Sequence, residues 1–351
     1  MSTGIPSLTD AGSTVWLDSV DPDELNDNVA WGVSGATSNP IIVAGLVSSG
    51  RFDDAFTRFM EQDLDDDELA WAMTDHLVKN AQDRLHDAWK RSGGDTGWVS
   101  FELDPLIDAD DSPLDHPQRV DEYVRLGKHW AQGHDNRMIK VPATPAGLDA
   151  IEPLCAAGVT LNVTLVFTQR QYELARDAMW RGAQRRDSLD HFKSGYSIFV
   201  SRVDVYTHKH VPSLSPDAQG LVGIANAKRI RQRNRDYWAD RNCPLKQEMI
   251  FASTGAKLEG DAFDKYVAEF AGSDIMTNPP DTNRRVHESG KTYPRRIDEL
   301  PPDAVLNEID DKVDLQKLED TLMQEGLAKF ADPHRELIDS IKSRRAELSS
   351  A

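Results

Sequence analysis

One lysine lies inside an apolar, β-branched run: Lys140 stands between Ile139 and Val141 in the segment RMIKVPAT. If this run is a buried strand, the ammonium group loses hydration there, which disfavours its charged form. A desolvated amine is a nucleophile toward carbonyl carbons and forms Schiff bases. The positive iminium then withdraws electrons from the neighbouring carbons, so that a carbon–carbon bond of a ketose can break. Lys140 is therefore the first candidate catalytic residue.

Acidic and hydroxyl side chains accompany other runs of the same kind. Asp18 ends VWLD, Glu102 ends VSFE, and Thr164 lies within NVTLVF. Apolar and polar residues alternate in these runs, so the polar side chains share one face; in NVTLVF we expect Val163 and Leu165 to share the other. Two carboxylates near an amine can carry the proton transfers of Schiff-base chemistry. A purely structural ion pair among these charges is the alternative.

Eight short apolar or β-branched runs recur along the chain and must position these residues. The runs span residues 14–19, 33–42, 98–105, 137–144, 159–168, 196–204, 248–255 and 274–282. Helical periodicity fills most of the intervals, and an eightfold strand–helix repeat predicts an α/β protein that is a (β/α)₈ TIM barrel. Active sites of such barrels lie at the carboxyl ends of the strands. A doubly wound open sheet is less favoured, because no glycine-rich phosphate fingerprint follows the first run.

The length of 351 residues fits one large barrel or two ordinary domains. We expect a single barrel domain over residues 1–351, with residues 300–351 as a C-terminal extension of one or two additional helices. The basic run KRIRQRNR, residues 228–235, is expected to form a solvated helix face.

The net charge of −19, from 59 acidic and 40 basic residues, argues against nucleic acid or anionic membranes as partners. The N-terminal segment has neither the basic start nor the apolar centre of a signal peptide, so we expect a cytoplasmic protein. Cys155 and Cys243 lack metal-ligand spacing and are expected to be reduced. No histidine occurs in the eight runs, which disfavours a metal-dependent barrel hydrolase. The sequence leaves the assembly open, with a homodimer as one option.

Seven segments together carry a resemblance to a known family. They are VWLDS, GATSNPIIV, VSFELDP, MIKVPATPAGLDAI, GVTLNVTLVFT, SIFVSRVD and FASTGAK. With these segments the chain resembles transaldolases, members of the class I Schiff-base aldolase superfamily. The insertion before SIFVSRVD and the form FASTGAK are similar to the longer bacterial transaldolases rather than to the shortest members.

The resemblance implies a transferase that uses no cofactor and no metal. Its substrates would be sugar phosphates: a dihydroxyacetone unit would move from a ketose phosphate to an aldose phosphate. The implied donors are sedoheptulose 7-phosphate or fructose 6-phosphate, and the implied acceptors are glyceraldehyde 3-phosphate or erythrose 4-phosphate. These reactions belong to the non-oxidative pentose phosphate pathway.

The resemblance also implies catalytic roles for four residues. Lys140 would form the Schiff base with the ketose. Asp18 would accept the proton of the C4 hydroxyl as the C3–C4 bond breaks and would return it to the new aldehyde. Glu102, with Thr164 holding a water molecule, would shuttle protons while the Schiff base forms.

Other residues would bind the substrate. By resemblance, Asn39 and Asn162 would contact hydroxyls of the dihydroxyacetone unit, and Ser197 would lie near its C1 hydroxyl. Arg202 and Ser253 match phosphate-binding positions, where a guanidinium offers a bidentate contact.

The phosphate end departs from the family pattern. Short transaldolases carry an arginine shortly after the serine that Ser253 matches, whereas this chain reads STGAK. Lys257 would take that role as a point charge that orients less well than a guanidinium. A solvated loop charge is the alternative for Lys257. Asp204 lies two residues after Arg202, and we expect it to orient the guanidinium.

Two further functions stay open besides transfer. A lyase similar to fructose-6-phosphate aldolase would release the dihydroxyacetone unit without an acceptor. Related aldolases tend to carry glutamine in place of the glutamate and tyrosine where this chain has Phe199, so Glu102 and Phe199 both match the transferase pattern. A sugar-phosphate-binding barrel without turnover is disfavoured, because the lysine, both acids and the threonine are all present.

Overall fold

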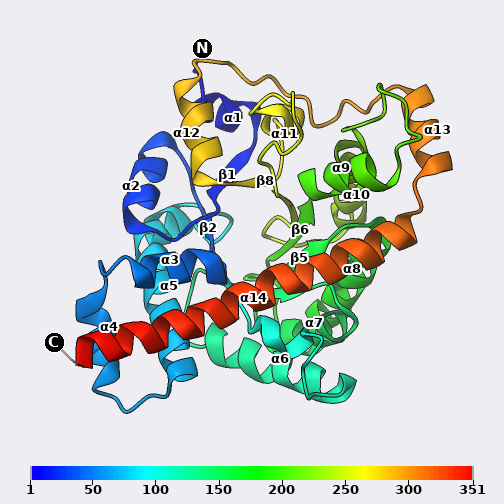
Figure 1. The fold of residues 1–351 in the computed structure, drawn as a ribbon. Coiled ribbons are helices and arrows are strands. Elements are labelled where there is room, and N and C mark those ends of the chain that lie inside the picture. The colour runs from blue at the N-terminus through cyan, green and yellow to red at the C-terminus, as the bar shows by residue number, and fades with distance from the viewer. Residues whose placement is uncertain (1, 350–351) are drawn as a thin grey trace.

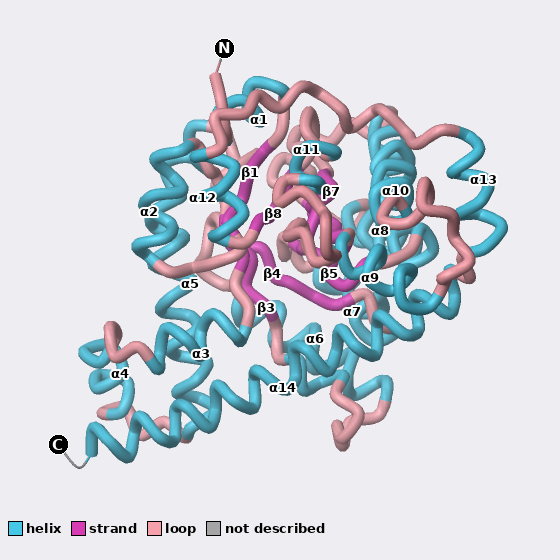
Figure 2. The backbone as a smooth tube through the Cα atoms, turned by 45° about the horizontal axis from the view of Figure 1, so that its top comes forward, coloured by secondary structure: helices cyan, strands magenta, loops and turns pink. Residues whose placement is uncertain are grey.

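Eight parallel strands close into a barrel at the centre of the molecule (Figures 1 and 2). The computed structural model describes residues 2–349. Neighbouring strands follow chain order, and β8 pairs with β1 to close the sheet. The predicted (β/α)₈ barrel is confirmed, and the open-sheet alternative is wrong. The strands are β1 (Thr14–Leu17), β2 (Ala36–Thr37), β3 (Val99–Glu102), β4 (Arg137–Pro142), β5 (Leu161–Val166), β6 (Ser194–Phe199), β7 (Glu248–Ala252) and β8 (Ile275–Asn278).

Helices surround the strands and connect each to the next (Figure 2). They are α1 (Ile5–Ala11), α2 (Pro22–Trp31), α3 (Pro40–Ser48), α4 (Asp53–Met60), α5 (Asp66–Arg91), η1 (Pro105–Asp108), α6 (His116–Ala131), α7 (Pro145–Ala156), α8 (Gln169–Ala183), α9 (Ser201–His210), α10 (Val222–Ala239), α11 (Lys265–Glu269), α12 (Pro280–Glu288), α13 (Asp303–Lys312) and α14 (Leu315–Ser349). Within residues 2–349, none of these helices is long and apolar enough to cross a bilayer.

Reciprocal caps fix where key helices begin. Before α8, the Thr168 side chain accepts from the Gln171 amide, and the Gln171 side chain accepts from the Thr168 amide. This capping box satisfies two backbone donors that a helix start leaves free. It therefore sets the turn by which the chain leaves the carboxyl end of β5.

Large apolar side chains fill the barrel lumen toward the amino ends of the strands. Trp16, Trp98, Met138, Ile250 and Ile275 form one buried cluster. Trp16 precedes Asp18 by two residues and Met138 precedes Lys140 by two, so each pair lies on the same face of its strand. The apolar cluster thus occupies the lumen toward the amino ends of the strands and leaves the carboxyl ends for polar side chains.

The alternation predicted for β5 fails at Leu165. A register shift separates Val163 from Val166 in the pairing with β6, and Leu165 has a left-handed φ of 56°. Bulges of this kind redirect side chains. Leu165 joins an apolar cluster with Phe167 and Phe199. Val163 stays in the larger cluster of buried apolar side chains, which is the main core of the molecule.

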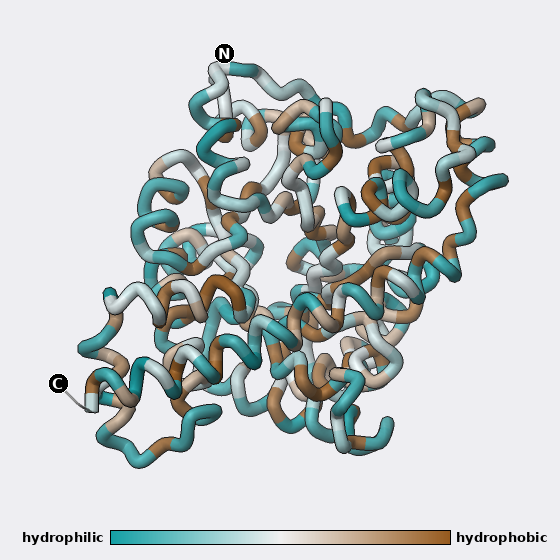
Figure 3. Tube along the Cα trace, in the orientation of Figure 1, coloured by the Kyte–Doolittle hydropathy of each residue, from teal (hydrophilic) through white to brown (hydrophobic). Residues whose placement is uncertain are grey.

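The C-terminal residues form two helices, and the long helix α14 spans one whole side of the molecule (Figure 1). It contacts α3, α5 and α9, and hydrophobic and hydrophilic positions alternate along it (Figure 3). Its Leu318 and Leu322 pack in the cluster of Phe199, while Leu337 and Ile341 pack in the main core. The predicted C-terminal helices are confirmed, and α14 in addition lies over the carboxyl ends of the strands, where its residues line the same cavity as the strand ends.

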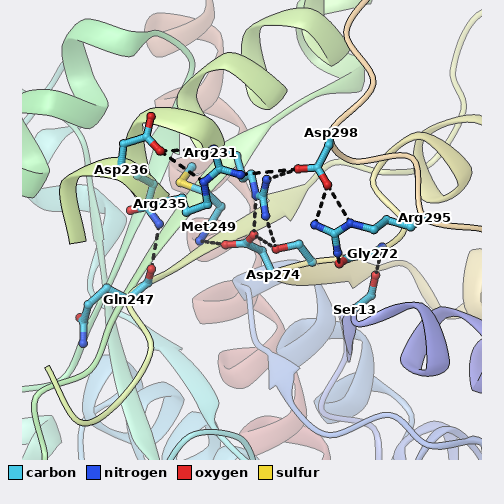
Figure 4. Close-up of polar contacts among 12 residues, drawn as sticks. Ser13, Arg231, Arg235, Asp236, Gln247, Met249, Gly272, Asp274, Arg295 and Asp298 are labelled. Atoms are coloured by element: carbon cyan, nitrogen blue, oxygen red, sulfur yellow. Dashed lines mark hydrogen bonds and ion pairs between the residues drawn. The ribbon is translucent and has the colours of Figure 1, made fainter. Parts of the chain in front are cut away.

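The prediction of a solvated basic face on α10 is partly wrong. Arg233 and Arg235 are exposed, but Lys228 and Arg231 are buried. Arg231 donates to Asp274 at 3.1 Å and to Asp298 at 2.7 Å (Figure 4).

A second buried set of contacts surrounds Lys228. Its Nζ lies 2.7 Å from Glu269 and donates to the carbonyls of Arg296 and Glu299. Buried charges require such partners, so this part of the basic run stabilises the contacts of α10 with neighbouring loops.

Gly35 provides the room for the Trp16 indole. A Cβ at Gly35 would lie 2.2 Å from Trp16 Nε1, well inside van der Waals contact. We therefore expect Gly35→Ala to lower the free energy of unfolding by about 1–3 kcal/mol through overpacking. Urea unfolding measures this.

The matched control is Gly45→Ala, in the interior of α3, where an added Cβ meets nothing within 4 Å. Helix propensity predicts that this variant gains about 0.5–1 kcal/mol. Equal stability of the two variants would contradict the packing assigned to Trp16.

Candidate active site

A cavity of about 480 Å³ opens at the carboxyl ends of the strands, between the barrel and α14. Nine of the eleven predicted site residues line it: Asp18, Asn39, Lys140, Thr164, Ser197, Phe199, Arg202, Ser253 and Lys257. The remaining two, Glu102 and Asn162, are buried and hydrogen-bonded to members of this set. The structure therefore brings all eleven residues together.

Lys140 and Glu102 are neighbours across the β3–β4 pairing. The Lys140 Nζ lies 3.3 Å from Glu102 Oε2, and both residues are buried. Burial raises the pKa of Glu102, although the Lys140 ammonium opposes the shift. A carboxyl group next to an amine is placed to exchange protons with it and with a bound substrate.

Asp18 is held by hydroxyl groups that the sequence analysis missed. Its Oδ1 accepts from Thr37 Oγ1 at 2.7 Å, and the Thr37 hydroxyl lies 3.1 Å from that of Thr277. Both threonines line the cavity. Their side chains point to the same inner face of the barrel as Asp18. The alternation of polar and apolar residues that identified Asp18 could therefore have identified them.

Two strands supply a polar wall beside Lys140. Asn162 donates to Ser100 Oγ at 2.9 Å and accepts from Ser197 Oγ at 2.7 Å, which fixes the orientation of its amide. The Thr164 hydroxyl is buried and has no hydrogen-bond partner among the described residues. Such an unpaired group at a cavity wall is available to a water molecule or a ligand.

Asn39 lies at the start of α3, at the edge of the cavity. Its side chain caps this helix by accepting from the Ile42 amide at 3.1 Å. The cap fixes the position of the side chain, because its amide oxygen is bound to the helix.

The opposite end of the cavity is cationic. Arg202 is the second residue of α9, near the positive end of the helix dipole. Its guanidinium lies over the Phe199 ring at 4.9 Å, and its buried Nη1 has no partner within residues 2–349. Arg202 lines the cavity, and a guanidinium with unused donors there is suited to an anion.

Ser253 and Lys257 complete this end. The Ser253 hydroxyl lies 2.8 Å from that of Ser201 and accepts from Lys257 Nζ at 2.9 Å. Ser253 has a left-handed φ of 57°, a conformation that costs about 1–3 kcal/mol and tends to occur at functional sites. Lys257 is exposed, but desolvation by the groups around it, together with the Arg202 and Lys329 charges, lowers its pKa to about 8.

Asp204 does not have the expected partner. Its carboxylate accepts from the Gly223 amide at 2.7 Å and from the Tyr266 hydroxyl at 2.8 Å. It therefore ties α9 to the start of α10 and to α11 rather than orienting Arg202.

Helix α14 supplies a wall of the cavity that the sequence analysis did not anticipate. Lys329, Phe330, Pro333 and Glu336 line it. No local signal in the sequence indicates this, because the helix reaches the site only through its packing on other elements.

The residues of the cavity do not form a metal site. Within the described residues, no group of three or more histidine, cysteine or acidic side chains could hold a metal ion. The polar groups present suit covalent chemistry by the amine, proton transfer by the acids and binding of an anion by the cations.

Comparison with known proteins identifies the class. The family Transaldolase/Fructose-6-phosphate aldolase matches residues 15–341, and the chain belongs to this family. Similar proteins named transaldolase occur in Mycolicibacterium paratuberculosis, at 30% identity, and in Renibacterium salmoninarum, at 29%. The first alignment covers 98% of both chains, and the second covers 97% of this chain and 96% of its relative. A protein of Streptomyces coelicolor named transaldolase 2 is 29% identical over 99% of this chain and 98% of its own length.

The lowered pKa of Lys257 allows a test of whether the cationic end of the cavity binds an anion. Sulfate stays a dianion across the neutral range, whereas Lys257 loses its charge as the pH rises through about 8. We expect sulfate affinity, measured by calorimetry, to fall about tenfold between roughly pH 7 and pH 9, since a charged hydrogen bond is worth ~1.5–3 kcal/mol.

The matched control for this titration is Lys257→Arg, which keeps its charge across the range. Its sulfate affinity should stay nearly constant. The same fall in both proteins would show that another group titrates.

Proposed function

We propose that this chain is a transaldolase that moves a dihydroxyacetone unit from a ketose phosphate to an aldose phosphate. The observation that carries the proposal is the placement of Lys140. Its amine lies 3.3 Å from the Glu102 carboxylate, in one cavity with Asp18 and with a cationic end. This arrangement supplies the nucleophile, two acid–base groups and an anion site that the reaction needs.

The first step is Schiff-base formation. The neutral Lys140 amine attacks the C2 carbonyl of the ketose and gives a carbinolamine. Loss of water from this intermediate needs a proton on the leaving hydroxyl, which Glu102 supplies, through a water molecule held by Thr164. The contact of Glu102 with Lys140 and the unpaired Thr164 hydroxyl support these roles.

The second step is cleavage of the C3–C4 bond. Asp18 takes the proton of the C4 hydroxyl, the bond breaks, and the electrons pass to the iminium to give an enamine. The first aldehyde leaves, and the acceptor aldehyde then reacts in reverse, with Asp18 returning the proton. The hydrogen bond that Thr37 donates to Asp18 Oδ1 supports this role, because it holds the carboxyl group in position in the cavity.

The remaining polar residues bind the substrate. Arg202, Ser253 and Lys257 hold the phosphate at the cationic end of the cavity. Asn39, Asn162 and Ser197 contact hydroxyls of the dihydroxyacetone unit. Support comes from the unpaired guanidinium nitrogen of Arg202 and from the hydrogen bond between Ser197 and Asn162.

Covalent trapping tests the nucleophile. Borohydride reduces an iminium to a stable amine, so wild-type protein treated with fructose 6-phosphate and borohydride should gain the mass of the adduct at Lys140. Lys140→Ala should gain none. Lys257→Met, which removes another amine of the same cavity, should still be labelled at saturating sugar. Label in Lys140→Ala would show that a different lysine is the nucleophile.

A substitution of Phe199 tests what makes the protein favour transfer over cleavage. It lines the cavity and packs on Phe167 at a centroid distance of 5.5 Å. In Phe199→Tyr, a hydroxyl enters an apolar part of the cavity and offers a proton to the enamine. We expect acceptor-independent release of dihydroxyacetone to rise about tenfold relative to transfer, measured on the same preparation.

The control for this variant is Phe167→Tyr, because Phe167 is the buried ring partner of Phe199 and does not line the cavity. It should leave the ratio of cleavage to transfer unchanged. An unchanged ratio in Phe199→Tyr would count against the role assigned to this position.

A further inference from the structure

One aromatic ring of α14 lies against the proposed nucleophile. The centroid of the Phe330 ring is 5.4 Å from Lys140 Nζ. Phe330 is 9% exposed and lines the same cavity as Lys140. The amine therefore has the Glu102 carboxylate as a polar neighbour and the Phe330 ring as an apolar one.

The packing of α14 fixes the position of this ring. Before Phe330, the buried side chains of Leu318 and Leu322 pack in the cluster that contains Phe199 and Leu165. After it, Leu337 and Ile341 are buried in the main core. A helix anchored on both sides of one residue holds that residue in place rather than letting it swing away.

The chemistry gives this ring a cationic partner at the iminium stages. A cation near an aromatic face is attracted by the negative charge of the ring centre. The nitrogen of Lys140 carries a positive charge as the iminium, before bond cleavage and again after the acceptor has added. In the neutral enamine between these stages, the apolar bulk of the Phe330 ring occupies space that water would otherwise fill.

We propose that Phe330 is a specificity-determining residue: it shields the covalent intermediate from water between departure of the first aldehyde and arrival of the acceptor. The proposal rests on the proposed transaldolase function. It assigns to the C-terminal helix the task of favouring transfer over hydrolysis.

The reaction that Phe330 suppresses needs only a proton and water. The enamine carbon takes up a proton, which restores the iminium. Water then adds to C2 and gives up a proton, and the bond between C2 and the lysine nitrogen breaks. Dihydroxyacetone leaves, and the free amine of Lys140 is regenerated.

The test compares three variants by the ratio of free dihydroxyacetone to transfer product. We expect Phe330→Ala to raise the ratio roughly fivefold or more, because water gains access to the intermediate. Phe330→Leu keeps apolar bulk and hence the fold, and should raise it by a smaller factor of about two. Leu322→Ala, a buried α14 position in the same apolar cluster that does not line the cavity, should leave it unchanged.

A second measurement follows the intermediate itself. Protein is loaded with fructose 6-phosphate, the released aldehyde is removed, and borohydride is added after increasing delays. The trapped adduct should disappear faster in both Phe330 variants than in wild type. A general loss of stability would not produce this order, because the amount of folded protein does not enter the decay rate.

The outcomes separate this inference from the function on which it rests. If wild type transfers and both Phe330 variants keep its ratio and decay rate, the shielding role is wrong. An equal rise in Leu322→Ala would also overturn it, since loosening of α14 would then be the cause. Absence of any transfer by wild type would instead reject the proposed function.

Discussion

The structure depends on keeping an amine and a carboxylate side by side in a buried place. Parallel pairing of β3 and β4 puts Lys140 directly beside Glu102, and the next strand adds Asn162 opposite Lys140. Removing two charges from water is costly, and their attraction seldom recovers the whole cost. Such a pair contributes little to stability and is better explained by the chemistry it allows. The apolar cluster around Trp16 supports this arrangement, because it fills the barrel lumen on the side of the polar groups that faces the amino ends of the strands.

The cavity has two ends of different character because two kinds of structure form it. Strand ends supply the acids and the amine, where the backbone is rigid and the side chains are close. The cationic end comes from the start of α9 and the loop after β7, where Arg202, Ser253 and Lys257 meet. The strand ends thus position the groups proposed to take part in bond cleavage, and charges on a helix start and a loop form the proposed phosphate site. Helix α14 closes the remaining side and contributes Phe330 next to the Lys140 nitrogen.

Much of this architecture could be predicted from the sequence, because strands in a barrel carry a local signal. Alternation and β-branched runs predicted the eight strands, and the same pattern put Asp18, Lys140 and Thr164 on the inner face. It failed at Leu165, where one left-handed residue shifts the register. The position of α14 could not be predicted. The pattern of an amphipathic helix shows which of its faces is buried, but not which other elements that face packs against. The partners of Arg231 lie 43 and 67 residues further along the chain, beyond any local pattern.

In the proposed reaction, the three-carbon unit passes to an acceptor rather than to water. The most direct measurement is release of glyceraldehyde 3-phosphate from fructose 6-phosphate, with and without erythrose 4-phosphate. Sustained release only in the presence of the acceptor is the predicted result. Equal release without it would make the protein a lyase, and no release under either condition would contradict the proposed chemistry.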